Sequence, residues 1–278
     1  MDLRKAPYDD PNAPAILIES LHQTGFAVVT EHPIAFKLIA DTYQEWQEFF
    51  SSPAKHNYTF DPEAQSGYFP FKSERAKDSS QPDLKEFFHL YTWSELPIGM
   101  GDRTRQLFHQ LTQLAAEILG WIEASERSPA CLRGLQLSQA IADSPATVLR
   151  ILHYPPLPDR VADGAIRAAA HEDINLITLL PAATATGLEI CDRQGKWHEV
   201  PCSMGDLVVN VGDMLQLASG GYYRSTTHRV VNPVGNLARR SRYSMPLFLH
   251  PRPETVLAEG VTASSYLKER LREIGLIS

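Results

Sequence analysis

Two histidines and one aspartate have the side-chain types and the spacing of a metal site. His171 and Asp173 are two positions apart, and in an extended strand such side chains project from the same face. His228 would join them from a later strand. Two imidazoles and one carboxylate on one side of a metal ion leave the opposite positions open, which is the facial arrangement of non-heme Fe(II) sites. We therefore predict that His171, Asp173 and His228 bind iron and form the catalytic centre.

An arginine and a serine that share one strand face follow the second histidine. Arg242 stands fourteen residues after His228, and Ser244 comes two positions later. A guanidinium beside a hydroxyl suits a carboxylate, because the rigid fork of arginine offers paired donors. Isolated histidines and arginines usually have ordinary structural roles, so the prediction rests on the order and the shared strand faces of all these residues.

The composition is typical of a globular protein that does not bind nucleic acid. The chain has 278 residues, of which 43% are hydrophobic, and this is enough for one large core. The formal net charge is −7, the pI is about 5.8, and no basic run of the nucleic-acid-binding kind stands out. Cys131, Cys191 and Cys202 are too few and too scattered for a disulfide scaffold or a zinc ribbon, so we expect free thiols.

The sequence contains no targeting or membrane signal. The first residues lack the apolar segment of a secretion signal. No stretch approaches the roughly 18–20 apolar residues of a membrane span. We therefore expect a cytoplasmic protein.

Hydrophobic periodicity separates a helical first half from a strand-rich second half. Apolar residues at helical spacing predict helices over 11–25, 33–50, 102–124 and 263–274. An irregular loop is expected over 51–97, with a turn at 67–70 and a short strand at 83–88. Apolar segments bounded by turn residues predict strands over 26–30, 148–154, 166–180, 187–191, 197–200, 206–211, 215–218, 223–231 and 241–249.

This spacing of strands indicates an antiparallel sandwich or barrel. We therefore predict a mainly β protein with flanking helices, of the α+β class. The expected regions are an N-terminal helical and loop region (1–145) that packs on the core, a strand core (146–255) and a C-terminal helix (256–278).

Four segments resemble the isopenicillin-N-synthase-like branch of the 2-oxoglutarate and Fe(II)-dependent oxygenases. The similarity extends over 145–255 and implies a double-stranded β-helix, or jelly-roll, core. The matching segments are 171–180 (HEDINLITLL) for the metal strand, 209–216 (VNVGDMLQ) for the N-x-G-D turn, 224–230 (RSTTHRV) for the strand of the distal histidine, and 241–248 (SRYSMPLF) for the cosubstrate strand.

The resemblance implies a role for each matching residue. His171, Asp173 and His228 would hold Fe(II). Arg242 and Ser244 would bind the distal carboxylate of 2-oxoglutarate.

The strand that ends at Tyr154 matches less closely. Plant-type members place a cosubstrate-binding tyrosine here, but they usually have asparagine two residues earlier, where this chain has Leu152. Tyr154 is expected to contact either the cosubstrate or, as in the synthase, the substrate.

The activity that the resemblance implies is oxidation of a C–H bond in a small metabolite, most simply its hydroxylation. Fe(II), 2-oxoglutarate and O2 would be required, and succinate and CO2 would be released. Neither a nucleic acid nor a membrane is expected as a partner, and the sequence leaves the substrate and the oligomeric state open. Strand parity, or reach from the 51–97 loop, suggests these substrate contacts: Phe248, Arg150, Tyr68, Phe88, Lys72 and Arg75.

Two alternatives stay open at this point. A 2-oxoglutarate-independent Fe(II) oxidase or cyclase, of the isopenicillin-N-synthase type, would use the same three metal ligands and an equivalent Arg–Ser pair. A catalytically inactive jelly-roll binding protein would share the fold, although the intact set of ligands argues against it.

Overall fold

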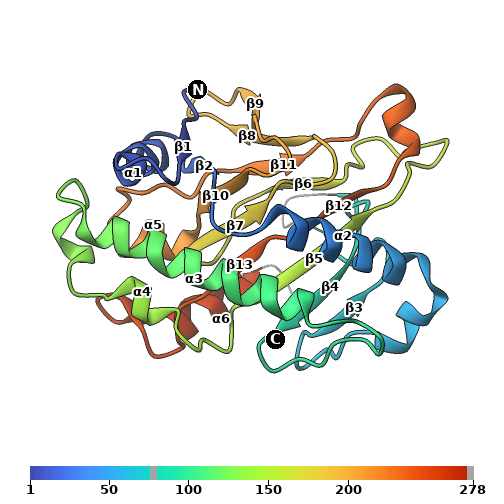
Figure 1. The fold of residues 1–278 in the computed structure, drawn as a ribbon, viewed down its shortest axis with the longest axis horizontal. Coiled ribbons are helices and arrows are strands. Elements are labelled where there is room, and N and C mark those ends of the chain that lie inside the picture. Colours follow the sequence, from blue (N-terminus) through green and yellow to red (C-terminus); the bar gives the residue numbers. More distant parts are fainter. Residues whose placement is uncertain (76–79, 274–278) are drawn as a thin grey trace.

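Two β-sheets form the centre of the molecule, which is described here from a computed structural model over residues 1–75 and 80–273 (Figure 1). In this described part of the chain, the large sheet has the strand order β1-β2-β10-β7-β13-β5-β4-β3, with β12 also paired to β5. The small sheet has the order β6-β11-β8-β9. This sheet-dominated architecture with flanking helices agrees with the predicted fold class.

The strands have the following bounds. The large sheet contains β1 (Lys5–Pro7), β2 (Phe26–Thr30), β3 (Gly67–Phe69), β4 (Glu86–Tyr91), β5 (Val148–Tyr154), β7 (Ile177–Pro181), β10 (Leu207–Val211), β12 (Arg242–Ser244) and β13 (Leu247–Leu249). The small sheet contains β6 (Ala168–His171), β8 (Leu188–Cys191), β9 (Trp197–Glu199) and β11 (His228–Val230). A separate pair consists of β14 (Val256–Ala258) and β15 (Val261–Thr262).

Helices cover one face of the large sheet (Figure 1). The long helix α3 repeats apolar residues at a helical period, and its side chains at Leu107, Leu111 and Ile118 are fully buried. They join a core that includes Leu149 and Ile151 of β5. The α-helices are α1 (Ala13–Thr24), α2 (Phe36–Ser51), α3 (Arg103–Ala124), α4 (Leu137–Ala140), α5 (Asp213–Ala218) and α6 (Ala263–Glu273), and the 3-10 helices are η1 (Pro53–Tyr58), η2 (Ala130–Leu132) and η3 (Gly235–Arg239).

The two faces of the large sheet have different chemistry, because side chains alternate along each strand. In β5, Leu149, Ile151 and His153 face the helices, and His153 packs on Phe50 of α2. The alternate residues, among them Tyr154, point to the opposite face. We call that opposite face, which looks toward the small sheet, the inner face.

Two predicted strands are split in the structure. The segment 166–180 forms β6 and β7, which belong to different sheets. Between them, the carbonyls of Asp173 and Asn175 accept hydrogen bonds from the first backbone N–H groups of α5 rather than from a neighbouring strand. The segment 241–249 divides into β12 and β13, with Met245 and Pro246 between them.

Other differences concern short segments. The segment 215–218 is part of helix α5 rather than a strand, since a short apolar run fits either element. Residues 67–69 form a strand instead of a turn, and the strand expected at 83–88 lies at Glu86–Tyr91. The strand predicted over 223–231 is limited to His228–Val230.

The region boundaries proposed from the sequence stay predictions. Strands β1 to β4 of the N-terminal region are integral parts of the large sheet, so this region completes the core as well as covering it. The C-terminal helix is observed as Ala263–Glu273, and the last residue of the predicted helix, 274, lies outside the described residues.

Truncation of Leu111 should destabilise the fold. This side chain is fully buried where α3 meets the sheet, so Leu111→Ala is expected to lower the free energy of unfolding by about 2–5 kcal/mol. Denaturant unfolding measures the change. The exposed Gln113→Ala on the same helix is the control and should stay within about 0.5 kcal/mol of the parent protein. Equal stability of the two variants would contradict the packing described.

Candidate metal centre

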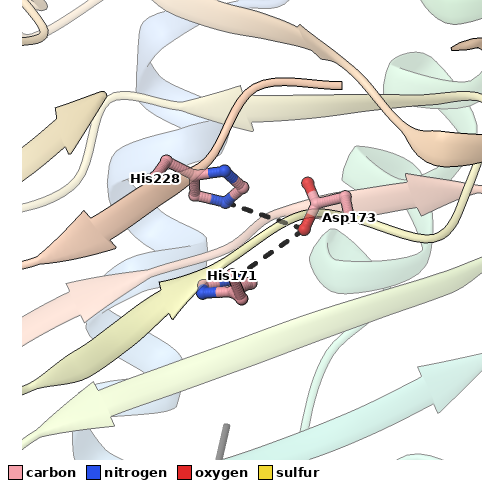
Figure 2. Close-up of side chains that lie close together, drawn as sticks. All are labelled: His171, Asp173 and His228. Atoms are coloured by element: carbon pink, nitrogen blue, oxygen red, sulfur yellow. Dashed lines mark ion pairs between the residues drawn. The ribbon is translucent and has the colours of Figure 1, made fainter. Parts of the chain in front are cut away.

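Three side chains direct ligand atoms toward one point at the junction of the two sheets (Figure 2). His171 ends β6, and His228 begins β11 directly opposite it in the antiparallel ladder. Asp173 follows two residues after His171, and its Oδ1 lies 3.9 Å from His171 Nε2 and 3.7 Å from His228 Nε2. The three ligand atoms all lie within 4.8 Å of one another, and no other such group of His, Cys, Asp or Glu occurs in the part of the chain that the structure describes.

Backbone carbonyls orient both imidazoles. The Nδ1 of His171 lies 2.7 Å from the carbonyl of Ala169, and the Nδ1 of His228 lies 3.1 Å from the carbonyl of Thr226. Because a carbonyl can only accept, each Nδ1 must carry the proton and donate it. Each Nε2 is then left with a free lone pair that points toward Asp173, which is the arrangement of a metal-binding histidine.

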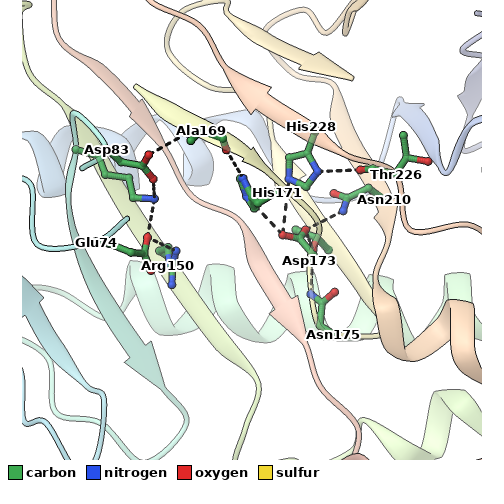
Figure 3. Close-up of polar contacts among 12 residues, drawn as sticks. Glu74, Asp83, Arg150, Ala169, His171, Asp173, Asn175, Asn210, Thr226 and His228 are labelled. Atoms are coloured by element: carbon green, nitrogen blue, oxygen red, sulfur yellow. Dashed lines mark hydrogen bonds and ion pairs between the residues drawn. The ribbon is translucent and has the colours of Figure 1, made fainter. Parts of the chain in front are cut away.

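Two neighbours hold the aspartate in place (Figure 3). The Oδ2 of Asp173 accepts hydrogen bonds from Thr178 Oγ1 at 2.6 Å and from Asn210 Nδ2 at 2.8 Å. Thr178 lies on β7 and Asn210 on β10, so both donors belong to the large sheet. Its other oxygen, Oδ1, is thereby directed at the histidines.

A glycine allows the turn that carries Asn210 to approach the aspartate. A Cβ atom on Gly212 would lie 2.1 Å from the backbone oxygen of Asn175 and 2.2 Å from its side-chain oxygen. In addition, Asp213 N–H donates to the carbonyl of Asp173 at 2.7 Å. The N-x-G-D segment found in the sequence therefore has a direct function as the support of Asp173.

The ionisation of His171 and Asp173 suits a cation. Burial, followed by the nearby His228, lowers the pKa of His171 to about 4. Burial would raise the pKa of Asp173, but the two histidines and the hydrogen bonds from Thr178 and Asn210 together lower it. Neutral imidazole and ionised carboxylate are the forms that bind a metal ion, so the residues present fit Fe(II).

A second polar group lies where β12 pairs with β5. Arg242 stands directly opposite Tyr154, and Ser244 stands opposite Leu152. Arg242 is 2% exposed, its guanidinium carbon lies 5.0 Å from the centre of the Tyr154 ring, and its Nε donates to the carbonyl of Ala185 at 2.9 Å. Its Nη1 is buried and has no hydrogen-bond partner among the described residues. A buried guanidinium with an unused donor fits an incoming carboxylate.

Phe248 and Arg150 also occupy the inner face. Phe248 is opposite Thr178 in the ladder, and the Arg150 guanidinium lies 5.5 Å from the centre of the Phe248 ring. Arg150 Nε donates to His89 Nε2 at 2.7 Å, and its Nη1 lies 3.2 Å from Glu74 Oε2. The structure thus brings these two predicted residues together on the side of the metal centre, where their contact with substrate stays a prediction.

A charged cluster beside the metal centre was not predicted from the sequence (Figure 3). Lys85 Nζ lies 2.6 Å from Glu74 and 2.7 Å from Asp83. Asp83 Oδ1 accepts from the backbone N–H of Ala169 at 2.9 Å and so fixes the strand that carries His171. The sequence signal is the pair of charges at 83 and 85, which alternate with Leu84 immediately before an aromatic strand.

Tyr68 and Phe88 point to the helix side of the large sheet rather than to its inner face, so their contact with substrate stays a prediction without support from the structure. Tyr68 is 1% exposed and donates its hydroxyl proton to Glu86, and Phe88 is 2% exposed and packs 5.1 Å from Trp46 of α2. They were expected to reach the site from a loop, but they lie on β3 and β4, and their side chains pack in the core on the helix side of the sheet. Their neighbours take the inner face, as a cluster that contains Phe69, Phe87, Leu152 and Tyr154.

Lys72 and Arg75 are exposed. The ammonium group of Lys72 lies 5.5 Å from the ring centre of its neighbour Phe71. Their contact with substrate stays a prediction.

Comparison with known proteins agrees with this site. Residues 145–251 match the 2OG-Fe(II) oxygenase superfamily, and residues 1–111 match the N-terminal region described for non-haem dioxygenases in morphine synthesis. A 2-oxoglutarate-dependent dioxygenase of Monascus ruber is 31% identical over 87% of this chain and 82% of its own. The chain belongs to the 2OG-Fe(II) oxygenase superfamily.

Solved structures support the same family. A putative oxygenase from Shewanella oneidensis shares 45% identity with this oxygenase over 100% of both chains, with a TM-score of 0.88. A full-length Neurospora crassa protein, solved in complex with alpha-KG and thymine, has the same fold at 21% identity, with a TM-score of 0.77 over 97% of this chain and 96% of its own.

Membership of this superfamily establishes the fold of the core and the cofactors of the protein. The chain is a 2-oxoglutarate/Fe(II)-dependent dioxygenase with a double-stranded β-helix core, and it uses Fe(II), 2-oxoglutarate and O2. Within the described residues, no helix is long and apolar enough to cross a membrane.

Substitution of Gly212 should weaken iron binding. In Gly212→Ala, the new methyl group would collide with Asn175 and displace the turn that supports Asp173. Loss of a group that orients a ligand lowers metal affinity by roughly 10–100-fold. Anaerobic titration with Fe(II) measures the affinity, and thermal melting shows whether the variant is folded.

Gly134→Ala is the matched control, since a Cβ there meets no atom within 4 Å. The control should bind Fe(II) like the parent protein. Unchanged affinity in a folded Gly212→Ala variant would show that the turn does not position the aspartate.

Proposed function

We propose that this oxygenase hydroxylates a C–H bond of a small metabolite, with 2-oxoglutarate converted to succinate and CO2. The observation that carries the proposal is the combination of two features. Three metal-ligand atoms converge at one point, and the buried Arg242 keeps a donor that no described residue uses.

In this proposal, His171, Asp173 and His228 hold the iron. Their donor set of two neutral imidazoles and one carboxylate suits Fe(II) and leaves coordination positions for other ligands. Bound iron supplies the oxidising power when 2-oxoglutarate and O2 are present. The protein contributes the orientation of the ligands, which the carbonyls of Ala169 and Thr226 set.

Arg242 and Ser244 would bind the distal carboxylate of 2-oxoglutarate, and Tyr154 would contact the cosubstrate or the substrate. Arg242 offers the free Nη1, and the Ser244 hydroxyl lies two positions along the same strand face. Burial of both residues excludes water, so a charge-assisted hydrogen bond to a carboxylate gains strength there.

The substrate would lie against Phe248 and Arg150 on the inner face. The aromatic ring offers an apolar wall, and the partly exposed guanidinium offers donors that could orient a polar group. The Neurospora crassa protein of this fold was solved with thymine, which supports a ligand of similar size here. A small molecule is therefore the class of substrate that we propose.

Removal of the Arg242 charge should abolish tight binding of 2-oxoglutarate. Titration of the anaerobic Fe(II)-loaded protein, followed by visible absorbance, should give a weak charge-transfer band. In Arg242→Gln the affinity is expected to fall by roughly 10–100-fold, because a hydrogen bond to a charged group contributes about 1.5–3 kcal/mol. The exposed Arg239→Gln serves as the control and should bind like the parent protein.

Succinate measurement tests the reaction itself. In air and with a substrate present, the proposed reaction releases succinate together with the hydroxylated product. Product without succinate would point instead to an oxidase that draws all its electrons from the substrate.

A further inference from the structure

A second buried arginine lies near the ring of Tyr154, as Arg242 does, and has no role in the site described so far. Arg167 directly precedes β6, the strand that carries His171, and only 1% of its surface is exposed. Its guanidinium carbon lies 5.9 Å from the centre of the Tyr154 ring, compared with 5.0 Å for Arg242. Two guanidinium groups thus share one tyrosine.

No carboxylate of the described residues neutralises these two charges. Among residues 1–75 and 80–273, neither Arg167 nor Arg242 has a Glu or Asp oxygen within 4.0 Å. Each donates one hydrogen bond to a neutral backbone carbonyl, Arg167 to that of Arg240 at 3.0 Å and Arg242 to that of Ala185 at 2.9 Å. The Nε of Arg167 and the Nη1 of Arg242 are buried and have no partner in the described part of the chain.

Burial of these two uncompensated charges costs free energy in the protein without a ligand. A buried charge is strongly disfavoured unless an opposite charge or a full set of hydrogen bonds compensates it. Burial, and then the charge of Arg242, lowers the pKa of Arg167 to about 10, so it is still a cation at neutral pH. Around the Tyr154 ring, two buried cations with unused donors thus have no counter-charge among the described residues, and an anion bound from outside the protein would stabilise them.

We propose that Arg167 is a second carboxylate-binding residue, which together with Arg242 selects a 2-oxo acid that has a distal carboxylate. The inference rests on the proposed function and extends it. With two guanidinium groups, the ratio of the affinities for a dicarboxylic and a monocarboxylic 2-oxo acid should be larger than with Arg242 alone.

Arg167 is also close in sequence to the metal centre. The chain runs from Arg167 into β6 and reaches His171 four residues later. The residue that binds the carboxylate and the metal ligand His171 would therefore lie at the two ends of the short strand β6.

Comparison of two ligands tests the proposal. 2-Oxoglutarate and 2-oxobutyrate share the 2-oxo acid end, but only 2-oxoglutarate has a distal carboxylate. Anaerobic calorimetric titration of the Fe(II)-loaded protein gives the dissociation constant of each. In Arg167→Gln, binding of 2-oxoglutarate should weaken by roughly 10–100-fold, whereas binding of 2-oxobutyrate should not change. The glutamine keeps a donor for the Arg240 carbonyl, which limits the structural change.

Two further variants make the test specific. Arg167→Lys keeps the positive charge without the guanidinium fork, so its preference for 2-oxoglutarate should lie between those of the parent protein and Arg167→Gln. It also provides the test if the glutamine variant does not fold. Arg239→Gln, which removes an exposed charge from the neighbouring 3-10 helix η3, should leave both dissociation constants unchanged.

Several results would overturn the proposal. Equal weakening of both ligands in Arg167→Gln would mean that Arg167 supports the strand of His171 instead of the distal carboxylate. Unchanged binding of both ligands would mean that the arginine takes no part. If the parent protein itself shows no preference for 2-oxoglutarate, and Arg242→Gln makes no difference, then the proposed cosubstrate site is wrong along with this extension of it.

Discussion

The carboxylate of Asp173 is the interaction on which the site depends, because it joins the two sheets. One of its oxygens accepts hydrogen bonds from Thr178 and Asn210 of the large sheet, and the other faces the two histidines of the small sheet. A change in the relative position of the sheets would separate the ligands. The metal centre can therefore form only when the jelly roll is closed, and a bound metal should in turn stabilise the closed fold.

Two groups of buried charged residues near this centre differ in whether their charges are balanced. Lys85 and Arg150 are balanced by Asp83 and Glu74, so this charged cluster is neutral by itself and stabilises the surrounding strands. The arginines next to Tyr154 have no such compensation among the described residues. A buried arginine that lacks its counter-charge is ready to bind an anion, whereas a balanced group such as that of Lys85 and Arg150 needs none.

The two faces of the large sheet have different roles: one packs in the main core, and the other lines the site. The sheet's helix-facing side chains are mostly apolar and join the main core, apart from a polar group at Glu86 and His153, while the inner face holds Arg150, Arg242, Ser244 and the second aromatic cluster. Variation of inner-face residues can therefore change specificity with little effect on the main core. This division agrees with the presence of one fold in chains that share 21–45% identity with this one.

The sequence predicted His171, Asp173 and His228 as the metal ligands and Arg242 with Ser244 as a pair, because their order and spacing form one recognisable pattern. A spacing of two does place Arg242 and Ser244 on one face of β12, but Asp173 lies just beyond the end of β6, and only the tertiary structure brings it to the two histidines. The sequence also determined most helices and several strands, since their apolar periods are long enough to be unambiguous. Period-two alternation does not say which face points inward, so only the tertiary structure decided that Phe69 and Phe87, and not Tyr68 and Phe88, share the inner face. The same holds for Arg167: its place near the Tyr154 ring, together with Arg242, results from a contact between distant strands, which no local pattern in the sequence encodes.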